Sequence, residues 1–215
     1  FAELYKGLMK SRGMTHLQAV TDVFAANNTA YAVCEYIDGI TLKSYLTTSA
    51  GELTWEQVKE LFPPILTTLS LMHSAGIVHR GISPDTIFVT DKMELKLAGF
   101  AIPAARTANT EIVCELYSGY AAPEQYSPSN RHGTWTDVYG IAAVLYRVLT
   151  GSMPPEAISR VDSDSLLEPL IVNRNVPPNV SKVIMKGMEL DVDSRTQTVT
   201  DFVNRLFEQP KPVIR

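Results

Sequence analysis

The sequence has few cysteines, no long apolar run and no cluster of basic residues. Only two of its 215 residues are cysteines, Cys34 and Cys114, and neither lies in a CxxC or Cys/His pattern. This spacing argues against a zinc site or a disulfide framework and fits a reducing compartment. The apolar stretch at 141–149 is interrupted by Arg147 and is too short to span a bilayer.

The charge balance argues against two further classes of partner. The chain has 19 basic and 23 acidic residues and a net charge of −4, with no run of Lys or Arg. Nucleic acid and anionic membrane surfaces are therefore disfavoured as main partners. No signal peptide is visible, and the chain opens at Phe1 without an initiator Met. We expect a piece of a longer polypeptide, with the presence of a targeting or membrane segment left open.

Three strongly patterned helices are present. The first is predicted from Thr54, where Gln57 completes a capping box, and its apolar residues recur at three- and four-residue spacing as far as Met72. Pro63 and Pro64 should bend this helix, because proline lacks an N–H and crowds the preceding turn. The second helix is predicted over 137–149, with Gly151 after its end, and the third over 179–190.

Shorter elements surround these helices. Residues 4–9 and 42–46 are predicted to be helical, 30–36 to form a strand, and 202–207 to form a short amphipathic helix. Two further strands, 87–89 and 95–97, follow a turn that carries His79 and Arg80. The sum is a small front that contains strands, followed by a larger helical body. Many enzymes hold catalytic carboxylates at the tips of such a two-strand unit, yet neither tip carries one here.

Five segments resemble, in order, the motifs of the protein kinase fold. GIVHRGISPDTIFV is similar to the catalytic loop H-R-D-L-K-P-x-N, and LKLAGFA to the strand and turn of the D-F-G motif. GYAAPEQY resembles the A-P-E segment, TDVYGIAAVLYRVLTG the long central helix, and LDVDSRTQTVTDFV the closing D-P-x-x-R-P motif. The chain most resembles the eukaryotic-like Ser/Thr kinases of bacteria. This implies an α+β, bilobal fold with a partial N-lobe at 1–37, a helical C-lobe at 38–208 and a tail at 209–215.

The resemblance places residues without the usual chemistry at the catalytic positions. Gly81 stands where the family has its proton-accepting aspartate, and Ser83 replaces the usual lysine. Thr86 replaces the metal-binding asparagine and Gly99 the metal-binding aspartate. Phosphoryl transfer depends on positioning and on metal ions that neutralise charge, and magnesium needs hard oxygen ligands. The alternative that Asp85 or Asp91 compensates is less favoured, because Asp91 fits ordinary turn chemistry.

Other matched positions are implied to be structural or regulatory. His79 and Phe100 match a stacked apolar spine between the lobes, and Asp137 matches the aspartate that binds the catalytic-loop backbone. Glu124 and Arg195 match a buried ion pair, so removing one partner should cost roughly 3–5 kcal/mol. Arg80 is implied either to engage a phosphate on the activation segment or to pair with a local carbonyl. Candidate phosphorylation sites in that segment are Thr107, Thr110, Tyr117 and Ser118, although exposed hydroxyls are common in loops.

The front of the chain resembles the strand and hinge that join the lobes. Cys34 would gate the back of an adenine pocket, and the backbones of Glu35 and Ile37 would face the ring. Such contacts need no particular side chain, so a hinge without a ligand is an equal alternative. The helix that normally supplies a glutamate has Tyr5 at the counted position, and Glu3 fits only with an insertion. The Gly-rich loop and its lysine would lie upstream of Phe1.

Three functions remain open on these residues. The first is an inactive kinase-like domain, a pseudokinase, that acts as a regulatory or scaffolding module for a signalling protein partner. The alternatives are a divergent active Ser/Thr protein kinase that uses ATP and a nucleotide-binding switch without chemistry. We expect no metal and no cofactor, with ATP binding weak or absent, and no contact of this segment with nucleic acid or membrane. Cytoplasmic exposure, alone or as part of a membrane-anchored protein, is implied by the resemblance only.

Overall fold

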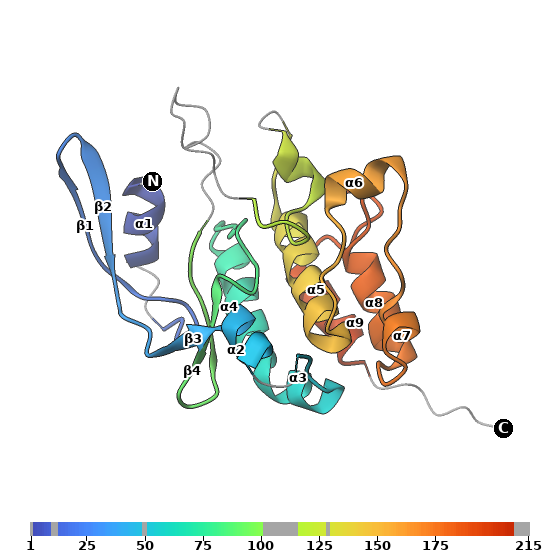
Figure 1. The fold of residues 1–215 in the computed structure, drawn as a ribbon. Helices are drawn as coiled ribbons and strands as arrows, with labels where there is room; N and C mark the ends of the chain where they lie inside the picture. The colour runs from blue at the N-terminus through green and yellow to red at the C-terminus, as the bar shows by residue number, and fades with distance from the viewer. Residues whose placement is uncertain (1, 10–12, 49–50, 101–115, 128–129, 209–215) are drawn as a thin grey trace.

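A computed structural model describes residues 2–9, 13–48, 51–100, 116–127 and 130–208. Helix α1 (Ala2–Met9) and the strands β1 (Val20–Ala26) and β2 (Thr29–Cys34) lie at one side of the molecule (Figure 1). Helices α5 to α9 form a larger body at the other side, and a small sheet with α2 and α4 lies between them. A mixed α and β architecture with a helical main body is therefore confirmed.

β1 and β2 form an antiparallel hairpin against which α1 packs. The turn between them contains Asn27 and Asn28, whose φ angles are +50° and +58°. Two successive left-handed residues suit the tight turns that match the twist of a hairpin, and asparagine tolerates that conformation. The sequence predicted β2 but not β1, because β1 is rich in alanine and lacks clear alternation. On the exposed face of the hairpin, Phe24 and Tyr31 stack with ring centroids 5.2 Å apart.

The central sheet has three antiparallel strands in the order β3 (Gly39–Thr41), β4 (Ile87–Thr90) and β5 (Leu95–Leu97). β4 and β5 are the two strands predicted after His79, and α2 (Leu42–Thr48) agrees with the short helix predicted beside the hinge. An isolated parallel bridge pairs Leu17 with Leu97, and it ties the front of the chain to this sheet.

The single bent helix predicted from Thr54 to Met72 is instead two helices, α3 (Trp55–Leu61) and α4 (Pro63–Ser74). The predicted capping box is confirmed, because the Gln57 N–H donates to the Thr54 hydroxyl and the Thr54 N–H donates to the Gln57 side chain. The break has a simple cause: Pro63 and Pro64 have no N–H to donate. Phe62 between the helices keeps helical dihedrals, and the Leu66 N–H still donates to its carbonyl.

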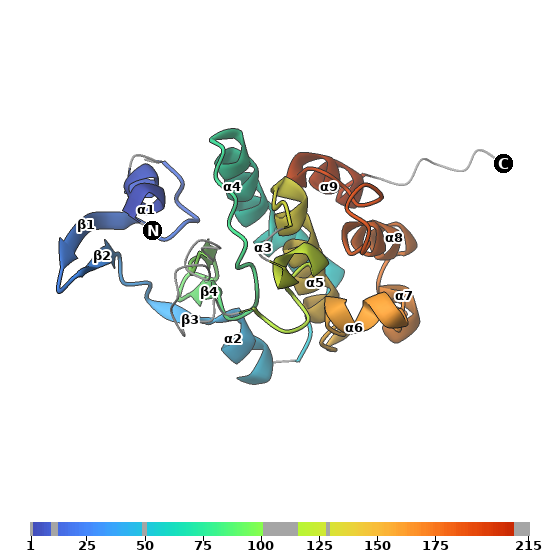
Figure 2. The ribbon, with the colours of Figure 1, turned by 90° about the horizontal axis from the view of Figure 1, so that it is seen from above.

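The helical body is organised around α5 (Thr134–Thr150), most of whose residues are buried. α8 (Pro178–Gly187) and α9 (Val199–Leu206) pack against it, as both views show (Figures 1 and 2). α5 begins three residues before the predicted start, because Thr134, Trp135 and Thr136 carry no apolar period. α8 ends at Gly187 rather than near residue 190, and the short helices α6 (Ala157–Asp162) and α7 (Pro169–Val172) were not predicted. Among the described residues, no helix combines the length and the apolarity needed to cross a bilayer.

Candidate functional site

The loop at 79–86 is held in place by the buried carboxylate of Asp137, in the first turn of α5. Its oxygens accept hydrogen bonds from the backbone N–H groups of His79 and Arg80, both at 2.7 Å. One of them is also 2.8 Å from Nε2 of His73. Arg80 has a left-handed backbone with φ of +63°, which is uncommon for a residue with a Cβ. Asp137 therefore makes the backbone contact that the resemblance implies and stabilises an unusual turn.

The hydroxyl of Thr86 is bound inside the loop itself. Its Oγ1 donates to the carbonyl of Gly81 at 2.6 Å and lies 3.1 Å from the carbonyl of Ser83. The same oxygen accepts from the Ser83 N–H at 3.0 Å. The Ser83 hydroxyl in turn accepts from the Asp85 N–H at 3.2 Å. Both hydroxyl side chains are buried, so the polar groups of this loop are satisfied by one another.

Gly99 lies directly against Thr86. Its φ of +70° is left-handed, and the Ala98 N–H beside it donates to the Thr86 carbonyl at 2.9 Å. A Cβ on Gly99 would lie 2.8 Å from the methyl carbon of Thr86, closer than carbon atoms pack. The two positions that the resemblance assigns to metal binding therefore meet through a methyl group. Because neither residue offers a free carboxylate or amide oxygen, the side chains here do not fit a magnesium ion.

The two nearby carboxylates point elsewhere. Asp85 forms an ion pair with Lys43 of α2 at 2.9 Å. Asp91 is exposed in the turn between β4 and β5, whereas Thr86 and Gly99 lie at the opposite end of the same strand pair. In the part of the chain that the structure describes, no group of three His, Cys, Asp or Glu side chains is arranged to hold a metal ion. This geometry does not favour compensation by either aspartate.

Three rings form a stack behind the loop. The rings of His79 and Phe100 are 4.4 Å apart at 30°, and Tyr5 of α1 meets Phe100 edge-on at 6.2 Å. His79 is fully buried, and burial lowers its pKa to about 4, so the ring is neutral near pH 7. The stack agrees with the apolar spine that the resemblance implies. Tyr5 belongs to this stack, while Glu3 is exposed on the same helix.

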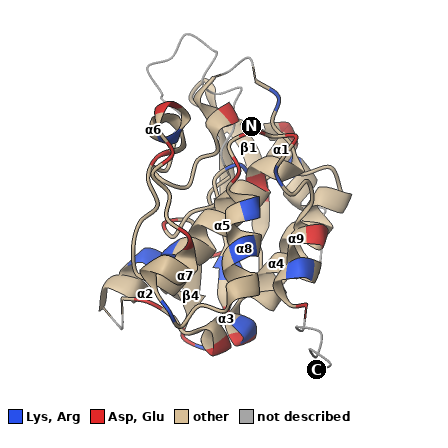
Figure 3. Cartoon of the chain, turned by 90° about the vertical axis from the view of Figure 1, so that its right-hand side faces the viewer, with Lys and Arg blue, Asp and Glu red and all other residues tan. Residues whose placement is uncertain are grey.

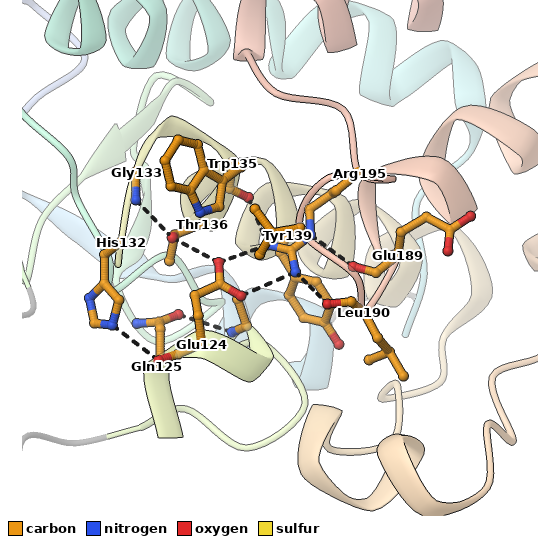
Figure 4. Close-up of polar contacts among 12 residues, drawn as sticks. Glu124, Gln125, His132, Gly133, Trp135, Thr136, Tyr139, Glu189, Leu190 and Arg195 are labelled. Carbon is orange, nitrogen blue, oxygen red and sulfur yellow. Dashed lines mark hydrogen bonds and ion pairs between the residues drawn. The ribbon is translucent and has the colours of Figure 1, made fainter. Parts of the chain in front are cut away.

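A buried ion pair joins the 3-10 helix η2 (Pro123–Tyr126) to the segment between α8 and α9 (Figure 4). The Arg195 guanidinium donates to both oxygens of Glu124, at 2.8 and 3.1 Å, and Thr136 donates to the same carboxylate at 2.9 Å. Arg195 also donates to the carbonyls of Glu189, Leu190 and Trp135. Such a bidentate pair, with its remaining groups satisfied, fixes geometry strongly. The predicted partnership between Glu124 and Arg195 is present.

Comparison with known proteins supports the resemblance to the protein kinase fold. A family model described as the protein kinase domain matches residues 6–211. The chain is a member of the protein kinase family.

Individual relatives show how far the likeness extends. The chain is 29% identical over 197 residues to a probable serine/threonine-protein kinase of Clostridium perfringens, which covers 87% of this chain and 28% of that protein. It is 30% identical over 179 residues to the serine/threonine-protein kinase PknL of Mycobacterium tuberculosis, with 78% and 44% covered. A solved structure entitled "PpkA-294 apo form" superposes with a TM-score of 0.79 at 28% identity, over 95% of this chain and 72% of that one. The chain thus spans less than half the length of these two curated relatives.

In the hinge of this kinase domain, Glu35 makes contacts that the sequence did not reveal. The side chain of Glu35 pairs with Lys96 at 2.6 Å and accepts from the Ala19 N–H at 3.0 Å. Its backbone carbonyl, expected to face an adenine ring, accepts a hydrogen bond from the Gln18 side chain at 3.0 Å. Burial alone would raise the pKa of Glu35, but the hydrogen bonds from Lys96 and Ala19 outweigh it and lower that pKa. No local sequence pattern predicts that Gln18 or Lys96 contacts Glu35, and Lys96 is 61 residues away from it in the chain.

The other two hinge residues, Cys34 and Ile37, have no feature that distinguishes a nucleotide site from a plain hinge. Cys34 ends β2 and is half-buried, and burial raises the pKa of its thiol. Ile37 is 7% exposed and belongs to the apolar interior. These positions agree equally with an adenine site and with a plain hinge.

Arg80 has a contact of the local kind, one of the two options that were predicted; most of the segment that the other option involves lies outside the described residues. Its Nη1 lies 3.4 Å from the carbonyl of Val78, and its buried Nε has no partner among the described residues. Burial lowers the pKa of this guanidinium. The carbonyl of Arg80 accepts from the Gln125 amide at 2.7 Å, which links the loop to η2. Thr107 and Thr110, proposed as phosphorylation sites, lie outside the described residues.

The sequence also missed a second buried arginine. Arg160 of α6 is 3% exposed and donates to both oxygens of Asp164, at 2.8 and 2.9 Å. It also donates to the hydroxyl of Tyr139 and to the carbonyl of Met188. Asp164 lies two residues beyond the end of α6, so the chain must turn back after the helix to bring the two charges together, and no helical pattern predicts the pair.

Proposed function

We propose that this kinase domain is catalytically inactive and acts as a regulatory or scaffolding module in signalling. The observation that carries the proposal is the contact between Thr86 and Gly99. The Thr86 hydroxyl is bound within its own loop, and its methyl group occupies the space beside Gly99. A domain with this centre is better suited to binding a protein than to transferring a phosphoryl group.

The physical reason is the charge that phosphoryl transfer must stabilise. Metal ions neutralise the phosphate oxygens in the transition state, and an aspartate accepts the proton of the incoming hydroxyl. Gly81 and Gly99 stand at the positions of the two aspartates and supply no side-chain oxygen. Because of these two replacements, we propose that the domain uses no metal and no cofactor and that ATP binds weakly or not at all.

A second candidate is a divergent but active Ser/Thr protein kinase. What favours it is the naming of the relatives, several of which are called serine/threonine-protein kinases. A third candidate, a nucleotide-binding switch without chemistry, would rely on hinge backbone contacts. The Gln18 amide already occupies one acceptor position on the Glu35 carbonyl, which weighs against that candidate.

One titration separates the three candidates. The melting temperature of the domain is measured with ATP alone, with Mg²⁺ or Mn²⁺ alone, and with both together, because a ligand that binds only the native state raises it. The inactive domain predicts a flat response to all of them. An active kinase predicts a shift that needs both ATP and metal, and a switch predicts a shift with ATP alone. Transfer of labelled phosphate to the domain or to a general protein substrate, dependent on added metal, would overturn the proposal.

We further propose that the partner is a signalling protein and that the domain works in the cytoplasm, free or as part of a membrane-anchored protein. The net charge of −4 supports a protein partner over nucleic acid or membrane. On the face shown in Figure 3, α3 and α9 carry both acidic and basic residues and α8 carries basic residues only, so this face is not uniformly basic.

A further inference from the structure

A cavity of about 270 Å³ lies in the helical body, between the segment that begins α3, the end of α5 and the loop that joins α7 to α8. We name it the Trp55 cavity. The helices α3 and α7 beside it lie toward the lower edge of the molecule in Figure 1. Its volume is just below the range of ligand pockets in general, roughly 300–1,000 Å³. It therefore suits a few side chains of a peptide better than a whole ligand.

The Trp55 cavity combines an apolar interior with an acidic rim. Of the residues that line it, Leu53, Leu149 and Val176 are only 4%, 1% and 2% exposed. Glu52 and Glu56, which also line it, are exposed. Glu56 pairs with a lysine of its own helix at 2.6 Å, whereas Glu52 forms no ion pair in the described part of the chain. Such a site favours an occupant that is both apolar and basic.

The last residues that the structure describes lie beside this cavity. Phe207, directly after α9, stacks on Trp55 with ring centroids 5.6 Å apart at 23°, and Trp55 lines the cavity. The Glu208 carbonyl lies 3.5 Å from the side-chain amide of Asn179 in the first turn of α8. Pro177, two positions before Asn179, lines the same cavity. The chain that follows therefore starts between two of the cavity walls.

The sequence that follows, QPKPVIR, has the matching chemistry. It contains two basic residues, Lys211 and Arg215, and no acidic residue. Pro210 and Pro212 fix their own φ angles and favour an extended backbone in the residues before them. An extended chain of this kind advances roughly 3 Å per residue, so Lys211 lies within about 10 Å of Glu208. The lysine can therefore reach the acidic rim.

We propose that residues 209–215 dock on the Trp55 cavity of their own domain, with the Lys211 ammonium beside Glu52 and the Val213 side chain over the apolar interior. A second copy of the chain offers the same chemistry, but a segment tethered at the cavity is present at an effective concentration of the order of millimolar. Docking would fix the direction in which the chain leaves the helical body. The inference goes beyond the proposed function and does not depend on whether the domain transfers phosphate.

The test is the accessibility of Trp55 to acrylamide, measured by quenching of its fluorescence. Trp135→Phe leaves Trp55 as the single tryptophan, and the indole N–H of Trp135 has no hydrogen-bond partner among the described residues. Lys211→Glu, Val213→Asp and Glu52→Lys should each raise the quenching constant about twofold, because each shifts the segment from mostly docked to mostly free. Combining Lys211→Glu with Glu52→Lys should restore the original value. Added salt should raise quenching in the parent.

A matched pair of charges shows whether position 52 is responsible. Glu60 is an exposed carboxylate of α3 that does not line the cavity. Glu60→Lys should leave the quenching constant unchanged, and combined with Lys211→Glu it should rescue nothing. Circular dichroism and melting temperature confirm that each variant folds. If Trp135→Phe does not fold, hydrogen exchange of the backbone amides at 52–56 gives the same comparison with both tryptophans in place.

Several outcomes overturn the inference. They are unchanged quenching in folded Lys211→Glu and Val213→Asp, no restoration in the double variant, or equal rescue by Glu60→Lys. Quenching that rises on dilution of the protein would assign the cavity to a second copy and would overturn docking within one chain. The proposed inactivity fails by a different result, metal-dependent phosphate transfer, so the two failures are distinguishable.

Discussion

Thr86 and Gly99 are 13 positions apart in the chain and share one small volume in the fold. The contact limits substitution at position 99, because any Cβ there would lie 2.8 Å from the methyl carbon of Thr86. The methyl and the hydroxyl of Thr86 also have separate tasks, since the hydroxyl holds the loop closed.

A double-mutant cycle tests this contact. Gly99→Ala should lower the free energy of unfolding by about 1–3 kcal/mol, from the clash and from the left-handed backbone. The same substitution in a Thr86→Ser background should cost less, because serine keeps the hydroxyl and removes the methyl. We expect a coupling energy of about 0.5 kcal/mol or more from urea unfolding. Strictly additive effects would show that the methyl is not the obstacle.

His79 gives the domain a predictable dependence on pH. Its pKa is about 4 in the folded protein, because the ring is buried, and near 6.5 when unfolded. Between these values the unfolded chain binds more protons, so stability falls as the pH drops from 6.5 to 4 and is unaffected by this group above 6.5. The loss should reach about 3 kcal/mol at pH 4. Urea unfolding of the parent and of His79→Phe, compared across this range, isolates the contribution; parallel curves would contradict it.

For individual residues, the sequence predicts a side-chain contact best where the family motifs contain both of the residues that make it. Asp137, Glu124 and Arg195 could be placed because the resemblance supplied the contact of each. Gln18 and Lys96 could not, since they bind Glu35 through contacts that only the folded chain creates. That Tyr120 and Arg147 line one cavity could not be predicted for the same reason, because the cavity is assembled from segments far apart in the chain.

Among the elements, the helices were predictable in kind but not in their ends. Apolar periodicity located α4, α5, α8 and α9, whereas the two prolines divided the first predicted helix into α3 and α4. The short helices α6 and α7 have too few turns to show a period. The end of α5 was the clearest boundary, because Gly151 has the left-handed conformation, with φ of +70°, that a helix terminus favours.

The same substitution at two glycines should have opposite effects. Gly151→Ala places a Cβ on a left-handed residue and should destabilise the domain by about 1 kcal/mol. Gly7→Ala lies within α1, where a new Cβ meets no atom within 4 Å, and alanine is the better helix former there. It should stabilise the fold by up to about 1 kcal/mol. Thermal unfolding checks both variants, and a shift of equal sign would refute the assignment of Gly151 as the helix terminator.

Across the whole molecule, stability should be unevenly distributed. α5 is buried on nearly all sides, while the hairpin β1–β2 is covered by α1 and leaves Phe24 and Tyr31 exposed. A two-stranded sheet is marginal without further packing. The division into a strand-containing front and a helical body was evident from the sequence. The open face of the hairpin was not, because β1 itself was missed.

Hydrogen exchange provides the measurement for this scale. Backbone amides of β1 and β2 should exchange through local opening, at a free energy well below that of global unfolding, while those in the middle of α5 should exchange only with the whole domain. Equal protection of the hairpin and of α5 would show that the front is as firmly held as the helical body.

The contact between Thr86 and Gly99 also restricts which single substitutions the protein tolerates at these two positions. An aspartate introduced at position 99 alone would clash with the methyl group of Thr86. An asparagine introduced at position 86 alone would remove the hydroxyl that donates the short hydrogen bond to Gly81 and closes the loop. Each single step toward an ion-binding centre therefore passes through a less stable protein, and only coordinated replacement of both residues avoids that intermediate.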